Sequence, residues 1–212
     1  MGSGHMPIGR RELAKQAKRE RIMTAARELF AEHGVGGVTT QQIADRAEVA
    51  IGTLYLYAST KAELLIMVQN EKFAAAIDDG LAAAHASTAH AAAGQGALEP
   101  VVALIRPVVE CVREHIENGR TYLHELVFGD PVEPYRNAGL ALGRRLEDSV
   151  TGLLTRHDHI DTADAATLAR VITAIIHLST TATVYLHHSD EGVIADIRDQ
   201  IHATLAPHRR AA

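Results

Sequence analysis

Apolar residues recur at intervals of three and four along most of this chain, and this spacing constrains the fold more than any other feature of the sequence. Ile194, Ile197, Ile201 and Leu205 give the clearest example. The spacing places side chains on one face of an α-helix. Aromatic residues make up only 4% of the 212 residues and Trp is absent, a balance that favours helices over a β-sandwich or a β-barrel. We therefore predict an all-α protein.

Residues that start and stop helices define the elements of the first half. A long helix is predicted over residues 10–33, and Gly34 ends it as a left-handed cap. A short helix over residues 40–47 follows, with Thr39 or Thr40 as its N-cap.

The next long helix starts after Ser59 or Thr60, and Glu63 completes a capping box if Thr60 is the cap. We expect this helix to reach about residue 79 or beyond. The aperiodic residues 82–96 then predict a helix end and a mobile connector.

The second half starts with a helix at Pro100, and Pro107 should kink or restart that helix because proline removes an intrahelical hydrogen bond. The remaining helices are predicted over residues 122–128, 134–156, 162 or 164 to 188, and 191–205.

The first six residues, MGSGHM, look like an expression scar and are set aside. No run of about 18 uncharged apolar residues predicts a membrane helix, so we expect a cytoplasmic protein. Cys111 is the single cysteine, which excludes an intrachain disulfide, and its pattern is that of a small apolar residue on a helix.

Charge is distributed unevenly along the chain. The net charge is −5, yet residues 10–21 hold six basic and two acidic residues, whereas residues 73–212 hold eleven Arg, no Lys and eighteen acidic residues. This asymmetry directs any contact with a polyanion to the N-terminal part. The basic arm could follow phosphates or a minor groove, or it could be a solvated helix.

The stretch VAIGTLYLY, residues 49–57, contains residues that favour extended chain. Its context predicts a helix instead, because a segment this short between helices leaves no room for a paired strand. Residues 40–47, a turn at 48–50 and a helix at 51–57 form a helix-turn-helix pattern, whose second helix reads bases in the major groove.

Residues 21–65 resemble the DNA-binding domain of the TetR family of bacterial transcriptional regulators. The segments that match the family are Ala-x-x-Leu-Phe-x-x-x-Gly (26–34), Thr-Thr-x-x-Ile-Ala (39–44) and Gly-Thr-Leu-Tyr-x-Tyr (52–57) leading to Lys61. The resemblance implies a helix-turn-helix domain at residues 7–60, after the scar at 1–6. It also implies that a fourth helix joins this domain to a larger helical ligand-binding and dimerisation domain at 61–212.

The resemblance assigns DNA contacts residue by residue. Thr40 corresponds to a phosphate contact, and Gln41 could read adenine through paired hydrogen bonds. The residues that open the recognition helix toward the bases are Ala50, Ile51, Gly52 and Thr53, and those that contact the backbone or the groove wall are Tyr55, Tyr57 and Lys61.

Two positions depart from the family pattern. Ile51 stands where many members carry a polar or basic residue, so it could meet a thymine methyl group. Ala58 replaces a usual aromatic, which predicts a thinner joint to the fourth helix.

The resemblance further implies a homodimer that binds a palindromic operator on double-stranded DNA. The expected interface residues on the last two helices are Val184, Ile194, Ile197, Ile201 and Leu205. An aliphatic pocket for a small hydrophobic effector is expected near Tyr122, Glu125, Phe128, Arg145, His177 and Thr180.

The predicted function is a repressor that a small apolar ligand releases from its operator. The alternative is a DNA-binding regulator controlled by a protein partner or acting without a small-molecule inducer. Two histidine clusters contain residue types that bind metals. They are His157-Asp158-His159 with Asp161, and the pair His187-His188. Their spacing is not that of a zinc helix, and no nucleophile elbow or phosphate loop is present. We expect no metal, no cofactor and no enzymatic activity.

Overall fold

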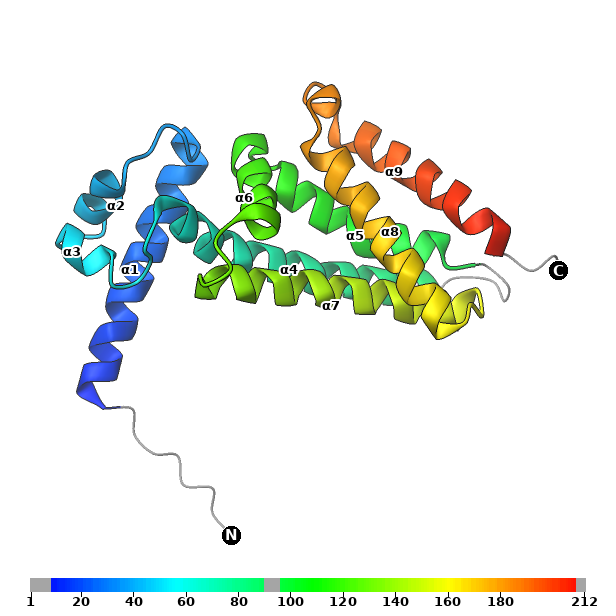
Figure 1. Cartoon of the computed structure of the whole chain (residues 1–212), viewed down its shortest axis with the longest axis horizontal. Helices are drawn as coiled ribbons and strands as arrows, with labels where there is room; N and C mark the ends of the chain where they lie inside the picture. Colours follow the sequence, from blue (N-terminus) through cyan, green and yellow to red (C-terminus); the bar gives the residue numbers. More distant parts are fainter. Residues whose placement is uncertain (1–8, 90–95, 209–212) are drawn as a thin grey trace, which may run out of the picture. The chain divides into compact units, whose positions relative to one another are not determined.

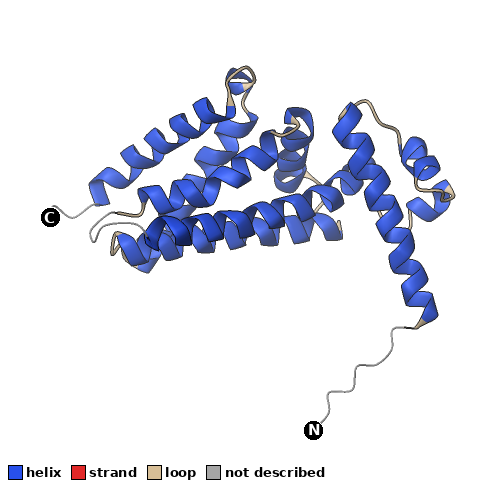
Figure 2. Cartoon of the chain, turned by 180° about the vertical axis from the view of Figure 1, so that it is seen from behind, coloured by secondary structure: helices blue, strands red, loops and turns tan. Residues whose placement is uncertain are grey.

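The computed structural model describes residues 9–89 and 96–208, and over these residues the chain contains helices and no strand (Figure 2). The all-α prediction is therefore confirmed. The chain divides into two compact units, Met1–Val68 and Gln69–Ala212. The sequence suggested a domain boundary between residues 60 and 61, a few residues before this division. No helix in the described ranges is long and apolar enough to cross a membrane.

The first unit is built on α1 (Arg10–His33), α2 (Thr40–Arg46), α3 (Ile51–Leu54) and the first turns of α4 (Lys61–Ala89) (Figure 1). Its core holds large side chains that are at most 2% exposed, Ile22, Met23, Phe30, Ile43 and Leu54. Burial of these residues holds two very short helices against α1, since helices of one or two turns are not stable alone.

The ends of α1 and α2 follow the predicted signals. Gly34 ends α1 at φ 69° and ψ 164°, and its N–H donates to the Phe30 carbonyl. This backbone is outside the left-handed helical region that we predicted, although its positive φ still favours glycine. Thr39 caps α2 in a capping box: Gln42 N–H donates to Thr39 Oγ1 at 3.2 Å, and Thr39 N–H donates to Gln42 Oε1 at 2.8 Å.

The helix-turn-helix has a shorter second helix than the sequence predicted. The helix α3 ends at Leu54 rather than at Tyr57, and the N–H groups of Leu56 and Tyr57 bond to carbonyls three residues back. The chain thus continues as tight turns rather than as extended strand. In the preceding turn, Glu48 adopts φ 51°, a conformation that costs a non-glycine residue roughly 1–2 kcal/mol.

The second unit contains the rest of α4 together with α5 (Leu98–Arg113), α6 (Ile116–Phe128), α7 (Pro134–His157), α8 (Thr162–Thr181) and α9 (Asp190–Leu205). The short 3₁₀ segments η1 (Thr183–Tyr185) and η2 (Ala206–His208) follow α8 and α9. In this unit α8 packs between α7 and α9, and α5 packs against α6 and α9 (Figure 1).

Several predicted boundaries in this unit are corrected, including the start of α6 at Ile116 rather than at residue 122. The helix α4 continues to Ala89, so most of the expected connector at 82–96 is helical, and its residues 90–95 lie outside the described part of the chain. Pro107 lies within a continuous α5, which starts at Leu98 rather than Pro100. The helix α8 stops at Thr181 instead of reaching 188, because the run Thr-Thr-Ala-Thr-Val has low helix propensity and Thr hydroxyls compete for backbone carbonyls.

Candidate nucleic-acid interface and ligand cavity

The residues predicted to bind DNA all belong to the first unit. Gln41, Ala50, Gly52 and Tyr55 are exposed, and the remaining five are half-buried: Thr40, Ile51, Thr53, Tyr57 and Lys61. Leu54, between them, is fully buried. Burial of Leu54 fixes which side of α3 faces the core and therefore which side is free.

The start of α2 and the end of α3 are joined through polar side chains. The hydroxyl groups of Thr40 and Tyr55 lie 3.2 Å apart, within hydrogen-bond distance. Gln41 Nε2 donates to Asp45 Oδ1 at 2.7 Å. This bond orients the Gln41 amide. To contact a base edge, Gln41 must either use its remaining amide atoms or break the hydrogen bond to Asp45.

Gly52 has no packing role inside the unit. A Cβ atom added to Gly52 would meet no atom within 4 Å. The absence of a side chain therefore does not serve the contacts of α3 with the rest of the unit. It leaves the backbone of α3 open to an external partner.

Tyr57 and Lys61 make bonds that support the frame of the domain. The Tyr57 hydroxyl donates to the Lys15 carbonyl at 3.1 Å, and Lys61 Nζ donates to the Val38 carbonyl at 2.9 Å. Both side chains thus connect the end of the helix-turn-helix to other parts of the first unit.

Leu56 lies just after α3 and is an exposed apolar residue that the sequence did not single out. It is 84% exposed, the most exposed large apolar side chain among the described residues. Its position four residues after Gly52 was the available signal, since that spacing places both residues on one side of a helical segment.

A cavity of about 540 Å³ lies inside the second unit. Its walls come from α4, α5, α6, α7 and α8 and include Phe73, Val108, Val112, Leu126, Phe128, Leu140, Leu146, Ile176, His177 and Thr180. Three of the six predicted ligand-binding residues, Phe128, His177 and Thr180, thus line one cavity, and its walls are largely aliphatic, as expected.

The other three predicted ligand-binding residues, Tyr122, Glu125 and Arg145, do not line this cavity. Tyr122 is buried in the core, where its hydroxyl donates to Asn70 Oδ1 at 2.9 Å, and burial raises the pKa of this phenol. Arg145 pairs with Asp78 at the surface. Glu125 lies near His124 Nδ1, at 3.8 Å.

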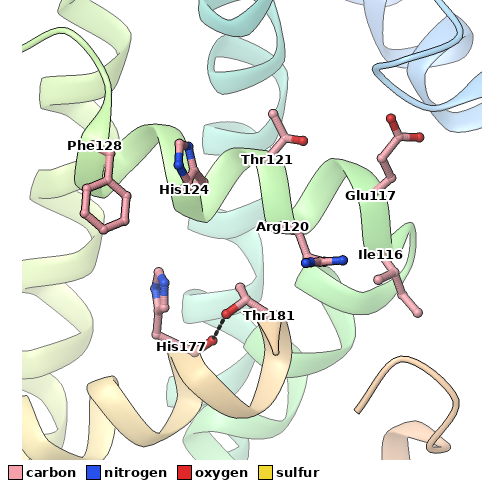
Figure 3. Close-up of a pocket in the computed structure, with 8 residues that line it drawn as sticks. All are labelled: Ile116, Glu117, Arg120, Thr121, His124, Phe128, His177 and Thr181. Atoms are coloured by element: carbon pink, nitrogen blue, oxygen red, sulfur yellow. Dashed lines mark hydrogen bonds between the residues drawn. The ribbon is translucent and has the colours of Figure 1, made fainter. Parts of the chain in front are cut away.

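A second, more polar cavity of about 600 Å³ adjoins the first and shares Phe128 and His177 with it. Its lining includes Arg120, Thr121 and His124 from α6 and His177 and Thr181 from α8 (Figure 3). The Arg120 side chain forms no hydrogen bond or ion pair with any residue in the described ranges. Burial lowers the pKa of His177, so this ring favours its neutral form.

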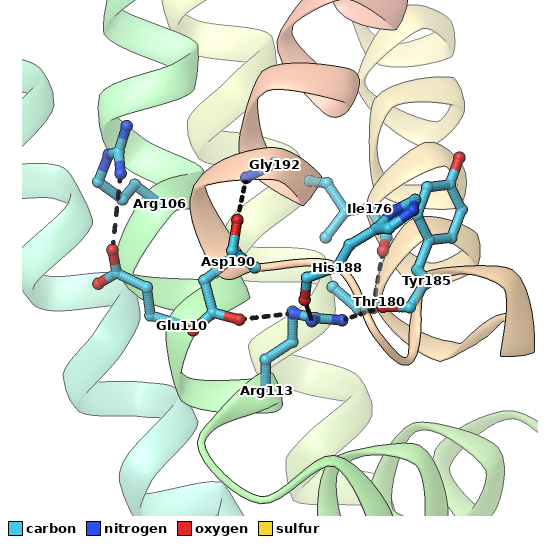
Figure 4. A network of polar contacts seen from close by, with 10 residues as sticks. Arg106, Glu110, Arg113, Ile176, Thr180, Tyr185, His188, Asp190 and Gly192 are labelled. Atoms are coloured by element: carbon cyan, nitrogen blue, oxygen red, sulfur yellow. Dashed lines mark hydrogen bonds and ion pairs between the residues drawn. The ribbon is translucent and has the colours of Figure 1, made fainter.

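A buried cation connects α5 to the segment between α8 and α9 (Figure 4). The Arg113 side chain is 2% exposed, and its Nε donates to Asp190 Oδ1 at 2.7 Å. Arg113 Nη2 donates to the His188 carbonyl at 2.8 Å. The guanidinium therefore holds the start of α9 against α5, next to the cavity residue Val112.

The four predicted interface residues on α9 are buried within a single chain. Ile194, Ile197, Ile201 and Leu205 are at most 2% exposed within a single chain. The helix α9 packs on α5 and α8, so these side chains are covered before a second copy could reach them. Val184, the fifth residue, is 70% exposed.

In the described residues, the two histidine clusters do not bring three possible metal ligands together. Within the described residues, no three His, Cys, Asp or Glu side chains are grouped so that they could hold a metal ion. Asp158 has a local structural contact instead, because its Oδ1 accepts the N–H of Ala97 at 2.8 Å just before α5.

Comparison with known proteins identifies the first unit. Residues 22–68 match the family described as "Bacterial regulatory proteins, tetR family". The HTH-type transcriptional repressor KstR of Mycobacterium tuberculosis is 37% identical over 60 residues, which are 28% of this chain and 27% of that protein. The matched segment thus spans about a quarter of the curated relative. The family contains regulatory proteins rather than enzymes.

Solved structures extend the similarity of the fold to the second unit. FadR of Thermus thermophilus, a TetR-family repressor solved with lauroyl-CoA, gives a TM-score of 0.65 at 22% identity and covers 92% of this chain and 96% of its own. FadR of Bacillus subtilis, solved with stearoyl-CoA, gives 0.59 at 20% identity, with 89% and 98% covered. The predicted architecture, a helix-turn-helix domain followed by a larger helical domain, is confirmed.

Proposed function

We propose that this chain, which belongs to the TetR family of bacterial regulatory proteins through its residues 22–68, is a homodimeric, sequence-specific DNA-binding transcription regulator. It represses transcription from a palindromic operator and is released from that operator by a small ligand.

The open backbone at Gly52 is the observation that supports DNA binding most directly. The helix α3 buries Leu54 and leaves Gly52 without a neighbour, so the side that faces away from the core can approach a groove closely. In the proposed complex Ala50, Ile51 and Thr53 read base edges with Gly52 between them, and Thr40 and Tyr55 contact phosphates.

Selection of bound DNA from a random duplex library tests this proposal. We expect a palindrome whose half-sites lie roughly 34 Å, or a multiple of that, apart. Selection that enriches no sequence would contradict the proposed function. In the selected operator, Gln41→Ala should relax the preference at one base pair by about 1–3 kcal/mol.

We propose that the exposed sides of α8 and α9 form the dimer interface. Val171 and Leu178 are exposed on α8 at a spacing of seven residues, and Val184 is exposed just after it. On α9, the small residues Ala195 and Ala203 are exposed. Exposed apolar side chains on one helix beside small residues on the next are suited to packing against a second copy.

We propose that the effector has an apolar chain and an anionic head. The aliphatic cavity fits the chain, and the adjoining polar cavity presents the unpaired Arg120 guanidinium to the head. The two FadR proteins that share the fold bind acyl-CoA thioesters, which combine these features. Their ligands therefore provide the first probe for this chain.

Calorimetric titration of lauroyl-CoA, with and without operator DNA, tests the effector class. We expect lauroyl-CoA to bind more weakly to the DNA-bound protein, by the same factor by which it weakens DNA binding. Arg120→Gln should weaken binding of lauroyl-CoA, whereas Arg144→Gln, at an exposed position outside both cavities, should not. Equal affinities in the presence and absence of DNA would contradict an inducer role, and absence of binding would contradict the proposed class.

A further inference from the structure

The first turns of α1 lack an apolar face that packs on the protein. Residues 10–18 are all exposed, including Leu13. In Figures 1 and 2 this part of α1 projects beyond α2 and α3 within the first unit. A helix that is exposed on all sides gains little from tertiary packing, so its surface is available to a partner.

Cations occupy one stripe of this projecting helix. Arg11, Lys15 and Lys18 are spaced by four and three residues, and the same spacing continues into the buried residues Ile22 and Ala26. The stripe that packs on the helix-turn-helix therefore becomes cationic where α1 extends beyond it.

The acidic and amide side chains occupy another face. Glu12, Gln16 and Glu20 repeat at intervals of four, which keeps them together on a helix. The local charge of +4 over residues 10–21 is thus concentrated on one side of α1 rather than spread around it.

Four of the cations have no protein partner in the described residues. The side chains of Arg10, Arg11, Lys15 and Lys18 form no ion pair or hydrogen bond there. Arg21, in contrast, lies 3.7 Å from Glu48. The unpaired charges are those on the projecting turns.

A hydrogen bond places this cationic stripe next to the candidate DNA interface. The Tyr57 hydroxyl donates to the backbone carbonyl of Lys15 at 3.1 Å, so the backbone in the middle of the stripe lies next to the segment that follows α3. A duplex docked on α3 would have its backbone next to these side chains.

We propose that Arg10, Arg11, Lys15 and Lys18 bind phosphates of the DNA that flanks the half-site contacted by α3. The inference rests on the proposed function, because it assumes that α3 docks on duplex DNA. The contacts are electrostatic and do not read sequence.

The salt dependence of DNA binding tests the inference. The double variant Lys15→Gln/Lys18→Gln removes two charges and keeps good helix formers. Its affinity for the selected operator and for a 40-base-pair duplex of random sequence is measured by fluorescence anisotropy at several KCl concentrations. The slope of log K against log[KCl] should become shallower by about 0.9 for each phosphate that is no longer neutralised, or about 1.8 per protomer. The ratio of specific to non-specific affinity should stay the same.

A matched control separates local contact from overall charge. Arg144→Gln/Arg156→Gln removes two exposed charges from the second unit and should leave the slope unchanged, and Lys15→Arg/Lys18→Arg should keep the wild-type slope. Circular dichroism shows that each variant is folded.

An unchanged slope in the Lys15/Lys18 variant, or an equal change in the control, would overturn the inference while leaving the proposed function intact. A wild-type protein that binds neither duplex would instead overturn the proposed function and, with it, the premise of the inference.

Discussion

At the residue scale, two glycines on helices have opposite reasons to lack a side chain. A Cβ at Gly52 would meet nothing within 4 Å, whereas a Cβ at Gly80 would lie against the backbone carbonyl oxygen of Leu104, well inside van der Waals contact. Gly80 is therefore required by packing between α4 and α5. Gly52 has no such requirement within the chain, and we assign its role to the approach of DNA.

Alanine substitution distinguishes these two roles. Gly52→Ala should leave stability unchanged or raise it by up to about 1 kcal/mol, because alanine favours helix, and it should weaken operator binding. Gly80→Ala should lower stability, since the backbone of Leu104 must move. Thermal unfolding and DNA titration measure both effects. Undiminished operator affinity in Gly52→Ala would argue against close approach at this position.

His177 predicts a pH dependence at the same scale. Burial lowers its pKa below the ordinary value of 6.5, so near that pH the unfolded chain binds more protons at this residue than the folded chain does. The stability contributed by the neutral ring is present above pH 6.5 and is lost as the pH falls through and below that value. The fall in Tm between pH 7.5 and pH 5.5 should be smaller in His177→Gln than in the wild type. An equal fall in both proteins would contradict this assignment.

At the element scale, the positions of short helices depend on a few contacts rather than on their own propensity. The helix α3 is only four residues long, and burial of Leu54 together with the Tyr57 and Lys61 bonds holds its surroundings in place. In the second unit, Arg113 holds the start of α9 in a similar way, through Asp190 and two backbone carbonyls.

Two ion pairs of different burial test how much Arg113 contributes. Asp190→Ala leaves a buried guanidinium without its carboxylate and should cost roughly 1–3 kcal/mol of unfolding free energy. Glu99→Ala breaks a pair with Arg198 in which both side chains are about half exposed, and should cost roughly 0–1 kcal/mol. Asp190 and Glu99 both lie in the first turn of a helix. Each substitution therefore loses a similar interaction with the helix dipole, and the difference between them reports on the ion pairs. Chemical denaturation that gives equal costs would contradict the role of Arg113.

At the scale of the whole molecule, the proposed function requires two copies of the chain. Because the apolar stripe on α9 is buried within one chain, we propose that association uses the exposed residues on α8 and α9. Leu178, on α8, is 64% exposed.

Leu178→Glu should therefore give a monomer in sedimentation experiments and abolish cooperative binding to a palindrome, because it places charges opposite each other or against apolar surface. Val132→Glu provides the matched control, since Val132 is 80% exposed in the connection between α6 and α7. A dimer that survives Leu178→Glu would place the interface elsewhere.

The sequence by itself determined the all-α class and the location of the helix-turn-helix pattern, because those depend on local spacing and on motifs that are continuous in the chain. The ends of α3, α5 and α8, in contrast, differ from the prediction. The bounds of α1 match the prediction, and the capping box at Thr39 follows from two residues three positions apart. The resemblance over residues 21–65 was equally local, and a family match over 22–68 bears it out.

Only the tertiary structure decided which side chains reach the cavity and which remain available to a partner. Phe128, His177 and Thr180 line one cavity, whereas Tyr122 is buried in the core. Tyr122 and Phe128 lie on the same helix, α6, so the helix pattern alone does not separate them. A regular apolar stripe such as that of α9 has the same spacing whether it packs within a chain or between two chains. The distinction depends on whether α5 and α8 already cover that stripe, and contacts between residues this far apart in the chain are not encoded in local periodicity.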